Sequence, residues 1–282
     1  MTNRTIKSTR TGFRTRDGAG VSLVRVLGRE TVNEFDPILM LDSFDSTNPE
    51  DYTAGFPLHP HRGIETISYL SKGKMVHKDT LGNEDEITDG EVQWMNAGSG
   101  ILHEEQVPAA ERLLGVQLWL NLPKADKFSK PYYHAIRKDE IQEIDFDGGK
   151  IRLLAGSFGD HVGFKGHHLP LDYYDIHLEK GREITLDTEE DASIMVFTLL
   201  GSINIEGEEV KEKTAAKLTD GHRVTIKNEG NFAQVLFIST RALNEPVAWA
   251  GPIVMNSQEE LEEAFSDLER GTFIRDDLEF ED

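Results

Sequence analysis

Residues 56–70 read FPLHPHRGIETISYL, and this stretch decides how the sequence is interpreted. Its second half has the composition of a β-strand, and His59 and His61 stand two positions apart at its start. Side chains at positions i and i+2 of a strand project from the same face, so both imidazoles are expected to point together. Pro60 between them cannot donate to a sheet ladder and therefore belongs at a strand start or a sheet edge. The stretch predicts half of a metal site at the mouth of a barrel.

The second half of that site is expected in NAGSGILHEEQ, residues 96–106. His103 and Glu105 again stand two apart, whereas Glu104 should face the other way. Three neutral imidazoles and one carboxylate leave open positions on a divalent ion, which is typical of non-haem Fe(II) oxygen chemistry. We therefore expect one divalent transition metal per chain, with Fe²⁺ favoured.

Glu65 competes with Glu105 for the carboxylate position, because it shares the parity of the first two histidines. It lies about 13 Å beyond His61 along a regular strand, so only a bend at Gly63 would bring it back. Geometry favours Glu105, and Glu65 stays open as the alternative. The other histidines are expected in ordinary surface or hydrogen-bonded roles: His77, His134, His161, His177 and the adjacent pair His167 and His168.

Composition excludes several classes of protein. The 282 residues contain no cysteine, which excludes disulfides and thiolate metal sites. No apolar run is long enough for a membrane span, and the first residues lack the apolar core of a secretory signal, so a cytoplasmic location is expected. The formal charge of −21 argues against nucleic acid as a partner, since the basic residues cluster only in the first fifteen positions.

Short alternating strands dominate the pattern and predict an all-β sandwich or barrel. In LLGVQLWLNLP, residues 113–123, apolar side chains occupy every second position from Leu114 to Leu120. The chain also repeats its turn sequences: Thr88-Asp89-Gly90 recurs at residues 219–221, and Gly73 matches Gly201. We therefore expect two copies of one barrel, a metal-binding domain over residues 1–135 and a second over residues 136–245.

The second copy should not bind metal. Shifting the four candidate ligands by the same offsets gives four residues without an imidazole: Asp187, Glu189, Gln234 and Leu236. One metal is therefore expected per chain, in the first barrel.

The remaining segment, residues 246–282, is expected to contain one helix. Ser257 and Glu260 fit a capping box, and Gly271 stands where a helix would stop. Leu261, Phe265 and Leu268 recur at helical spacing, which predicts an amphipathic helix of about three turns packed against a barrel.

Four segments closely resemble the pirins, which are bicupins, and the resemblance runs over nearly the whole chain. They are DPILMLDSFDS, FPLHPHRGIETISYL, GEVQWMNAGSGILHEE and EPVAWAGPIVMNSQEELEEAFSDLERGTF. The resemblance implies an all-β fold of two cupin (jelly-roll-like) β-barrels packed face to face, with a short C-terminal α-helix. It also implies a metal held by His59, His61, His103 and Glu105. The wider cupin superfamily has Pro-x-Gly-x-x-His in the second segment, and this chain shares with pirins the departure at residues 96–103.

The same resemblance implies two functions. Some bacterial pirins are similar to quercetinases, which open the heterocycle of flavonols with molecular oxygen and release carbon monoxide; Glu105 would then be the catalytic base for the 3-hydroxyl group. Phe56, Trp94 and Met95 would line the apolar cavity or belong to the barrel core. The alternative is an iron-dependent, redox-sensing regulatory protein that binds a protein partner without turnover. A third possibility is metabolic regulation through direct contact with an enzyme, for which the acidic helix over 257–270 is a candidate docking face. We rank the dioxygenase first.

Overall fold

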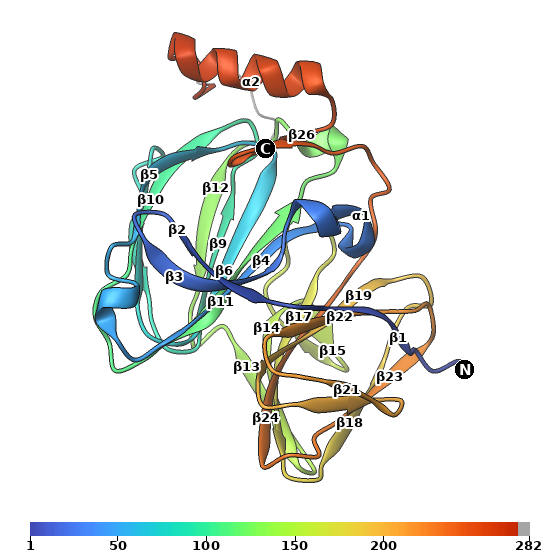
Figure 1. Cartoon of the computed structure of the whole chain (residues 1–282). Helices are drawn as coiled ribbons and strands as arrows, with labels where there is room; N and C mark the ends of the chain where they lie inside the picture. Colours follow the sequence, from blue (N-terminus) through green and yellow to red (C-terminus); the bar gives the residue numbers. More distant parts are fainter. Residues whose placement is uncertain (276–282) are drawn as a thin grey trace. The chain divides into compact units, whose positions relative to one another are not determined.

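The computed structural model describes residues 1–275, and in it the chain forms two compact units built from antiparallel strands (Figure 1). The predicted all-β fold with two barrels is confirmed. We call the unit that contains the histidine-rich stretch the first barrel and the other unit the second barrel. The first barrel comprises Arg14–Leu23, Ile38–Ile136 and the described residues from Leu243 onward, and the second comprises Met1–Phe13, Val24–Pro37 and Arg137–Ala242.

The first barrel consists of a seven-stranded sheet in the order β12-β9-β6-β11-β4-β3-β2 and a four-stranded sheet in the order β5-β10-β7-β8. The larger sheet contains β2 (Phe13–Asp17), β3 (Val21–Leu27), β4 (Ile38–Ser46), β6 (Ile64–Lys72), β9 (Glu91–Asn96), β11 (Leu113–Asn121) and β12 (Tyr132–Ile136). The smaller sheet contains β5 (Phe56–His61), β7 (Met75–Asp79), β8 (Glu84–Ile87) and β10 (Ile101–Gln106).

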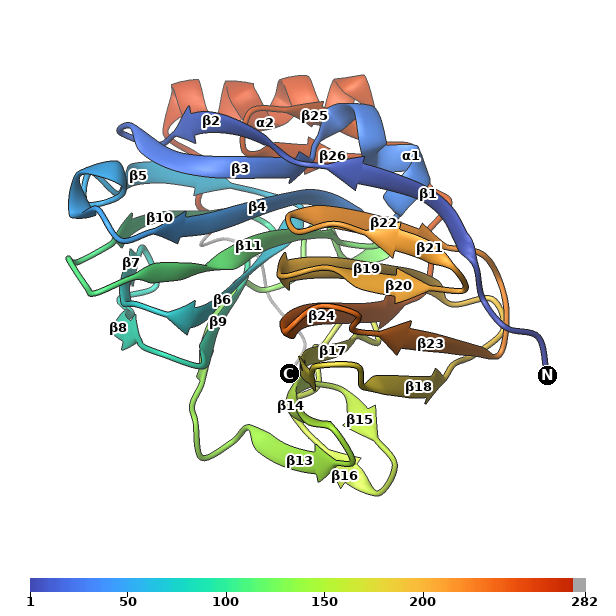
Figure 2. The same ribbon diagram turned by 60° about the horizontal axis from the view of Figure 1, so that its bottom comes forward.

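The second barrel repeats this topology strand for strand, with sheets in the orders β1-β22-β19-β24-β17-β14-β13 and β18-β23-β20-β21 (Figure 2). Its larger sheet contains β1 (Ile6–Thr11), β13 (Gln142–Phe146), β14 (Gly149–Ala155), β17 (Asp172–Glu179), β19 (Ser193–Leu200), β22 (Thr214–Leu218) and β24 (Phe232–Thr240). Its smaller sheet contains β18 (Glu183–Asp187), β20 (Ile203–Ile205), β21 (Glu208–Val210) and β23 (Arg223–Lys227).

The internal repeat is therefore real, but one of the two sequence matches that indicated it was misplaced. Gly73 follows β6 and Gly201 follows the corresponding strand β19, so this match is correct. In contrast, Thr88-Asp89-Gly90 precedes β9, whereas residues 219–221 follow β22, the counterpart of β9. The tripeptide match was wrong by one strand, because turn residues recur at any tight connection. The shift that placed His103 and Glu105 on Gln234 and Leu236 therefore pointed to β24, whereas the counterpart of β10 is β23.

The division into units also differs from the contiguous boundaries expected from the sequence. Strand β1 lies in the second barrel, where it pairs with β22 from Ile6 opposite Leu218 to Thr11 opposite Thr214. The C-terminal segment lies in the first barrel, where the hairpin of β25 (Ala248–Ala250) and β26 (Ile253–Met255) packs beside the histidine-rich stretch. Thus β1 pairs with a strand distant in sequence, and the C-terminal hairpin contacts residues 61 and 62, which composition alone does not indicate.

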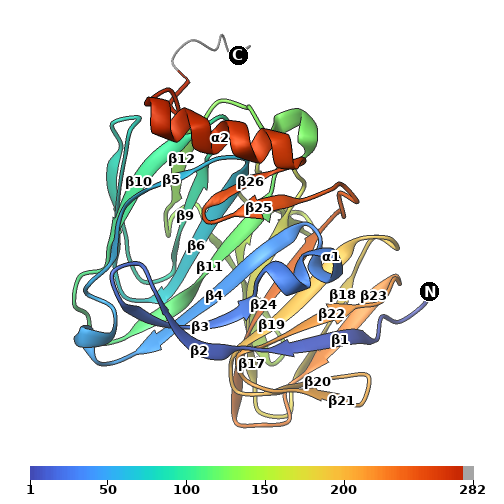
Figure 3. The same cartoon turned by 45° about the horizontal axis from the view of Figure 1, so that its top comes forward.

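The predicted C-terminal helix is α2 (Gln258–Arg270), which covers the β25–β26 hairpin (Figure 3). Ser257 and Glu260 form the expected capping box, and Gly271 ends the helix with φ of 72°. The buried face is Leu261 and Ala264, whereas Phe265, expected on that face, is 38% exposed.

The other helical segments are short: α1 (Val32–Phe35) and the 3-10 turns η1 (Arg29–Thr31), η2 (Pro49–Asp51) and η3 (Lys124–Asp126). A small two-stranded sheet of β15 (Ser157–Phe158) and β16 (His161–Val162) completes the described strands. Within residues 1–275, no helix has the length and apolar character required to cross a membrane.

Candidate metal centre

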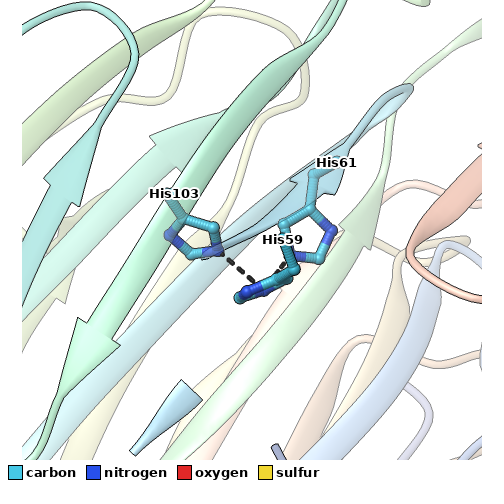
Figure 4. A group of neighbouring side chains, drawn as sticks. All are labelled: His59, His61 and His103. Atoms are coloured by element: carbon cyan, nitrogen blue, oxygen red, sulfur yellow. Dashed lines mark hydrogen bonds between the residues drawn. The ribbon is translucent and has the colours of Figure 1, made fainter. Parts of the chain in front are cut away.

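Three histidines converge at the β5–β10 edge of the first barrel (Figure 4). His103 on β10 pairs directly with His59 on β5, which brings together two residues 44 positions apart. The Nε2 atom of His59 lies 3.0 Å from Nε2 of His61 and 3.1 Å from Nε2 of His103. Within the described part of the chain, this is the single group of at least three potential ligands whose donor atoms all lie within 4.8 Å of one another.

For His59 and His61, the hydrogen bond on the far side of the ring shows which nitrogen is unprotonated. Nδ1 of His59 lies 2.8 Å from the carbonyl oxygen of Pro57, and Nδ1 of His61 lies 3.0 Å from that of Pro252. A carbonyl oxygen only accepts, so both Nδ1 atoms must carry the proton. In the neutral rings the lone pairs are therefore on Nε2, pointing at one another.

Burial keeps two of these rings neutral. His61 and His103 are 1% and 0% exposed. Desolvation, followed by the charge of His59, lowers the pKa of His61 to about 3. Desolvation, followed by the charges of His61 and His59, also lowers the pKa of His103 well below its usual value. Both rings thus keep a lone pair for a metal ion at neutral pH.

These observations fit a bound metal ion. The Nε2 atoms of His59 and His61 both accept, so they cannot satisfy each other by hydrogen bonding, and burial makes that arrangement costly without a cation. Adjacent imidazole nitrogens at roughly 90° around an ion, each at about 2.1 Å from it, are separated by roughly 3.0 Å. The two measured Nε2 separations agree with this spacing, and the donor set suits a divalent transition metal.

Glu105 is buried on the same face of β10 as His103, while Glu104 between them is half-buried, as strand alternation predicted. Its carboxylate is held by two amides: Gln93 Nε2 donates to Oε1 at 2.6 Å, and Gln117 Nε2 donates to Oε2 at 2.9 Å. Glu105 is not in the group of three ligand atoms. Its position as a fourth ligand therefore remains a prediction.

A β-bulge separates the two candidate ligands of β10. His103 pairs with His59, but Glu105 pairs with Phe56, so Pro57 and Leu58 together stand opposite one residue. Leu58, which neighbours His59 in the strand, faces outward and is 60% exposed. A cleft of about 530 Å³ borders the bulge, and its lining includes Phe56, Pro57 and Glu105. One of the three expected lining residues, Phe56, thus lies at an open cleft.

Glu65 faces away from this site. Ser68, on the opposite face of β6, accepts a hydrogen bond from Gln117, which holds Glu105. Glu65 Oε1 instead accepts hydrogen bonds from Trp94 Nε1 and the Tyr132 hydroxyl, each at 3.0 Å. Since Trp94 binds Glu65, it also lies on the far face of the sheet and does not line the histidine cluster. The chain bends at Gly63, where φ is +79°, and β6 begins after this bend.

The buried Glu65 leads to a prediction about pH. Desolvation raises its pKa to about 7, against hydrogen bonds from Trp94 and Tyr132 that lower it, and Oε2 has no hydrogen-bond partner. A carboxyl whose pKa is raised on folding contributes stability below its unfolded pKa, and this contribution is lost as pH rises towards 7. The difference in free energy of unfolding between Glu65→Gln and the unmodified protein should therefore change with pH. We expect it to shift by roughly 2–3 kcal/mol in favour of Glu65→Gln as the pH rises from 5 to 8.5.

Urea denaturation at the two pH values measures this difference. The exposed carboxylate of Glu84, paired with Lys78 at 3.1 Å, provides the control Glu84→Gln, which should follow the unmodified protein at both pH values. Parallel stability curves for Glu65→Gln and the unmodified protein would show that Glu65 is ionised throughout.

The C-terminal segment closes the site, which sequence reasoning did not anticipate. Besides the Pro252 carbonyl on His61, Lys127 Nζ donates to the carbonyl oxygens of Gly63 and Val254 at 2.8 and 2.9 Å. A Cβ atom on Gly63 would lie 2.0 Å from the Val254 oxygen, so the close approach of β26 requires glycine there.

Two aromatic rings also cover the C-terminal side of the site. Trp119 on β11 packs edge-on against His61, with ring centroids 5.0 Å apart. Trp249 of the β25–β26 hairpin lies next to Trp119 at 5.8 Å. The hairpin thus contributes both a hydrogen-bond acceptor and an aromatic ring to the surroundings of His61.

His77 is a second residue whose position the sequence did not reveal. It was expected in an ordinary role, but its Nδ1 atom lies 3.3 Å from Nδ1 of His103, and both side chains are fully buried. The available signal was the spacing of His77 and Asp79, which share one face of β7 as His103 and Glu105 share one face of β10.

The second barrel has an aliphatic core where the first has its histidines. Strands β18 and β23, the counterparts of β5 and β10, contribute Ile184, Leu186, Val224 and Ile226 to its hydrophobic cluster. Their paired residues include Thr185 opposite Thr225. Thus the duplicated fold is stabilised by apolar packing at this position in one barrel and carries polar chemistry in the other.

Comparison with known proteins agrees with this architecture over almost the full chain. The family described as Pirin matches residues 20–120, and the family described as Pirin C-terminal cupin domain matches residues 173–274. A pirin-like protein of Caulobacter vibrioides is 38% identical over 266 residues, which cover 93% of this chain and 96% of the relative. Human pirin is 33% identical over 261 residues, which cover 89% and 88%.

A solved structure is similarly close. The crystal structure of quercetin 2,3-dioxygenase from Acinetobacter baumannii aligns with a TM-score of 0.89 and 31% sequence identity. The alignment covers 96% of this chain and 99% of that one, so both barrels and the C-terminal segment have counterparts there.

Proposed function

Because this chain belongs to the pirin family of bicupin proteins, we propose that it is a metal-dependent dioxygenase that opens the heterocycle of a flavonol with molecular oxygen and releases carbon monoxide. The likeness to quercetin 2,3-dioxygenase from Acinetobacter baumannii supports this reaction and a quercetin-like substrate. Fe²⁺ is the proposed metal, since imidazole ligands with open positions suit its oxygen chemistry.

The observation that carries the proposal is the orientation of the three imidazoles. His59, His61 and His103 would hold the ion through Nε2, with Glu105 as the proposed fourth ligand. When bound, the ion supplies a Lewis acid for the flavonol 3-hydroxyl oxygen and one-electron chemistry towards O₂. The side chains around the ion would accept the proton and bind the substrate.

Glu105 is the proposed base for the 3-hydroxyl proton. Gln93 and Gln117 donate to its two oxygens and fix the plane of the carboxylate, while Gln117 itself accepts from Trp119 Nε1 at 3.3 Å. Proton acceptance requires one carboxylate oxygen to exchange an amide donor for the substrate hydroxyl. The Gln117 amide is the better candidate for release, because it also has Ser68 Oγ at 3.2 Å as an alternative acceptor.

The aromatic residues suit a planar substrate. Phe56 lines the cleft, Trp119 packs against His61, and Trp249 lies next to Trp119. Rings at an active site bind flat aromatic molecules by stacking and exclude water from the reacting atoms. We propose that the flavonol enters between these groups.

Carbon monoxide measures the proposed reaction directly. The full chain is reconstituted with Fe²⁺ under anaerobic conditions, quercetin is added, and O₂ is admitted. We expect one carbon monoxide per quercetin consumed with the metal-loaded protein, and none with the metal-free protein at equal concentration.

Stoichiometric iron without carbon monoxide would contradict the dioxygenase and favour the redox-sensing, partner-binding alternative. A flavone with the same ring system but without the 3-hydroxyl group serves as a matched control, because it offers no 3-hydroxyl proton to Glu105. It should bind without turnover.

A further inference from the structure

We propose that Asp79 and His77 form a positioning pair that sets the tautomer of His103 and so turns its Nε2 lone pair towards the ligand cluster. The inference concerns the metal site on which the proposed function rests, but it does not depend on dioxygenase turnover. Its parts are a chain of three buried groups that ends at His103: Asp79 Oδ2, the ring of His77, and Nδ1 of His103.

Asp79 fixes the tautomer of His77. Nε2 of His77 lies 2.8 Å from Asp79 Oδ2, and neither side chain is exposed. A carboxylate only accepts, so Nε2 of His77 must carry the proton. In the neutral ring, Nδ1 of His77 is then an acceptor.

His77 in turn fixes the tautomer of His103. The two Nδ1 atoms lie 3.3 Å apart, and only one of them can hold the proton between them. Since Nδ1 of His77 accepts, Nδ1 of His103 donates, and its Nε2 is left unprotonated 3.1 Å from Nε2 of His59. A reversed tautomer would place a proton inside the cluster, where it would compete with a metal ion.

The pair is held rigidly. Asp79 Oδ1 accepts from the backbone N–H groups of Leu81 and Asn83, at 2.9 and 3.0 Å, and Oδ2 also accepts from Asn83 Nδ2 at 2.9 Å. The His77 ring stacks on Tyr133 with centroids 4.2 Å apart and planes inclined by 13°. Carboxylate–histidine contacts behind a ligand orient the ring and raise its basicity in metal sites generally.

His103 differs from the other two histidines in this respect. The Nδ1 partners of His59 and His61 are backbone carbonyls, which no substitution converts into donors. The partner of His103 is a side chain whose own tautomer depends on another side chain. The tautomer of His103 can therefore be changed by a substitution that replaces none of the ligands.

Asp79→Asn tests this chain of hydrogen bonds. An amide NH₂ that faces Nε2 of His77 donates to this nitrogen, so the proton of His77 moves to Nδ1. The Nδ1–H group of His77 then faces the Nδ1–H group of His103, and two donors cannot form a hydrogen bond. We expect affinity for Co²⁺, measured by competition with a chelator, to fall roughly 10- to 100-fold. We also expect the ¹⁵N spectrum of the metal-free protein to show the His103 proton moving from Nδ1 to Nε2, which a purely structural role would not produce.

The second barrel provides a matched control. Asp175 is likewise buried, and its Oδ2 lies 2.9 Å from Nε2 of His177 two residues away, but no ligand cluster is attached to this pair. Asp175→Asn should leave Co²⁺ affinity within about twofold. His77→Gln retains an acceptor for His103 and a donor for Asp79 and should keep affinity within about threefold, whereas His77→Met should lose as much as Asp79→Asn.

Unchanged affinity and an unchanged His103 tautomer in folded Asp79→Asn would overturn the inference. If that variant does not fold, equal affinity of His77→Gln and His77→Met would overturn it instead. A wild-type protein that binds no metal would refute the metal site itself, whereas one that binds metal without releasing carbon monoxide would refute only the dioxygenase.

Discussion

His103→Ala is expected to abolish carbon monoxide release and to weaken metal binding by roughly 300-fold. Structural Zn²⁺ sites in small domains bind their ion with about 10–16 kcal/mol; on that scale one of three or four ligands accounts for roughly 3–4 kcal/mol, which corresponds to this factor. The loss should be larger than for a surface histidine because the ring is fully buried and no water replaces it with matching orientation. Metal content after gel filtration and chelator competition measure the effect, and carbon monoxide is measured in parallel.

Two further variants make this result interpretable. His161→Ala removes an exposed imidazole that contacts Gln142, far from the ligands in sequence and in the other barrel, and should change neither binding nor turnover. His59→Ala removes a half-buried ligand, so it perturbs the barrel less than His103→Ala while losing the same interaction. Full metal loading of both ligand variants would contradict the proposed site.

Arg62→Met is expected to destabilise the first barrel by about 3 kcal/mol, since it removes the buried cation of an ion pair. The Arg62 guanidinium is 1% exposed and donates to Asp267 Oδ2 of α2 at 2.8 Å. It also donates to the carbonyl oxygens of Ser99 and Phe273, at 2.7 and 2.8 Å, and lies 4.2 Å from the Phe273 ring centroid. Methionine fills similar volume but leaves both carbonyls without their donor.

A matched control exists on the same carboxylate. Arg270 also donates to Asp267, at 2.9 Å, but its side chain is 60% exposed. Arg270→Met should therefore cost at most about 0.5 kcal/mol. Urea denaturation gives both values, and hydrogen exchange should show faster exchange across α2 in Arg62→Met only. Equal stability of the two variants would show that Arg62 does not hold the helix.

Arg62→Met should also affect the candidate metal site. Arg62 follows His61 directly, and its guanidinium joins the loop before β10, through Ser99, to the C-terminal helix. Loosening α2 should free the β25–β26 hairpin, whose Pro252 carbonyl orients His61. We therefore expect Arg62→Met to lower metal affinity as well as stability, although Arg62 touches no ligand atom.

Local pattern in the sequence was sufficient for the fold class, for the C-terminal helix and for much of the site. Alternation along strands gave the shared face of His103 and Glu105, because residues two apart in an extended chain project together whatever the fold. The capping box and the glycine stop gave the limits of α2, since these interactions lie within one turn of the chain. The His-x-His pair gave two of the three converging imidazoles for the same reason.

What only the tertiary structure decided depends on contacts between distant segments. The Pro252 carbonyl orients His61 from 191 residues away, and no local pattern marks a carbonyl as a partner. Strand order corrected the tripeptide match of the repeat, because turn residues do not record which strands they connect. Glu65, an alternative ligand in the sequence analysis, faces away from the histidines, whereas His77, expected in an ordinary role, contacts His103; the physical reason is the same. Side-chain parity within a strand is local, whereas the sheet face that becomes a site is set by the strands packed around it.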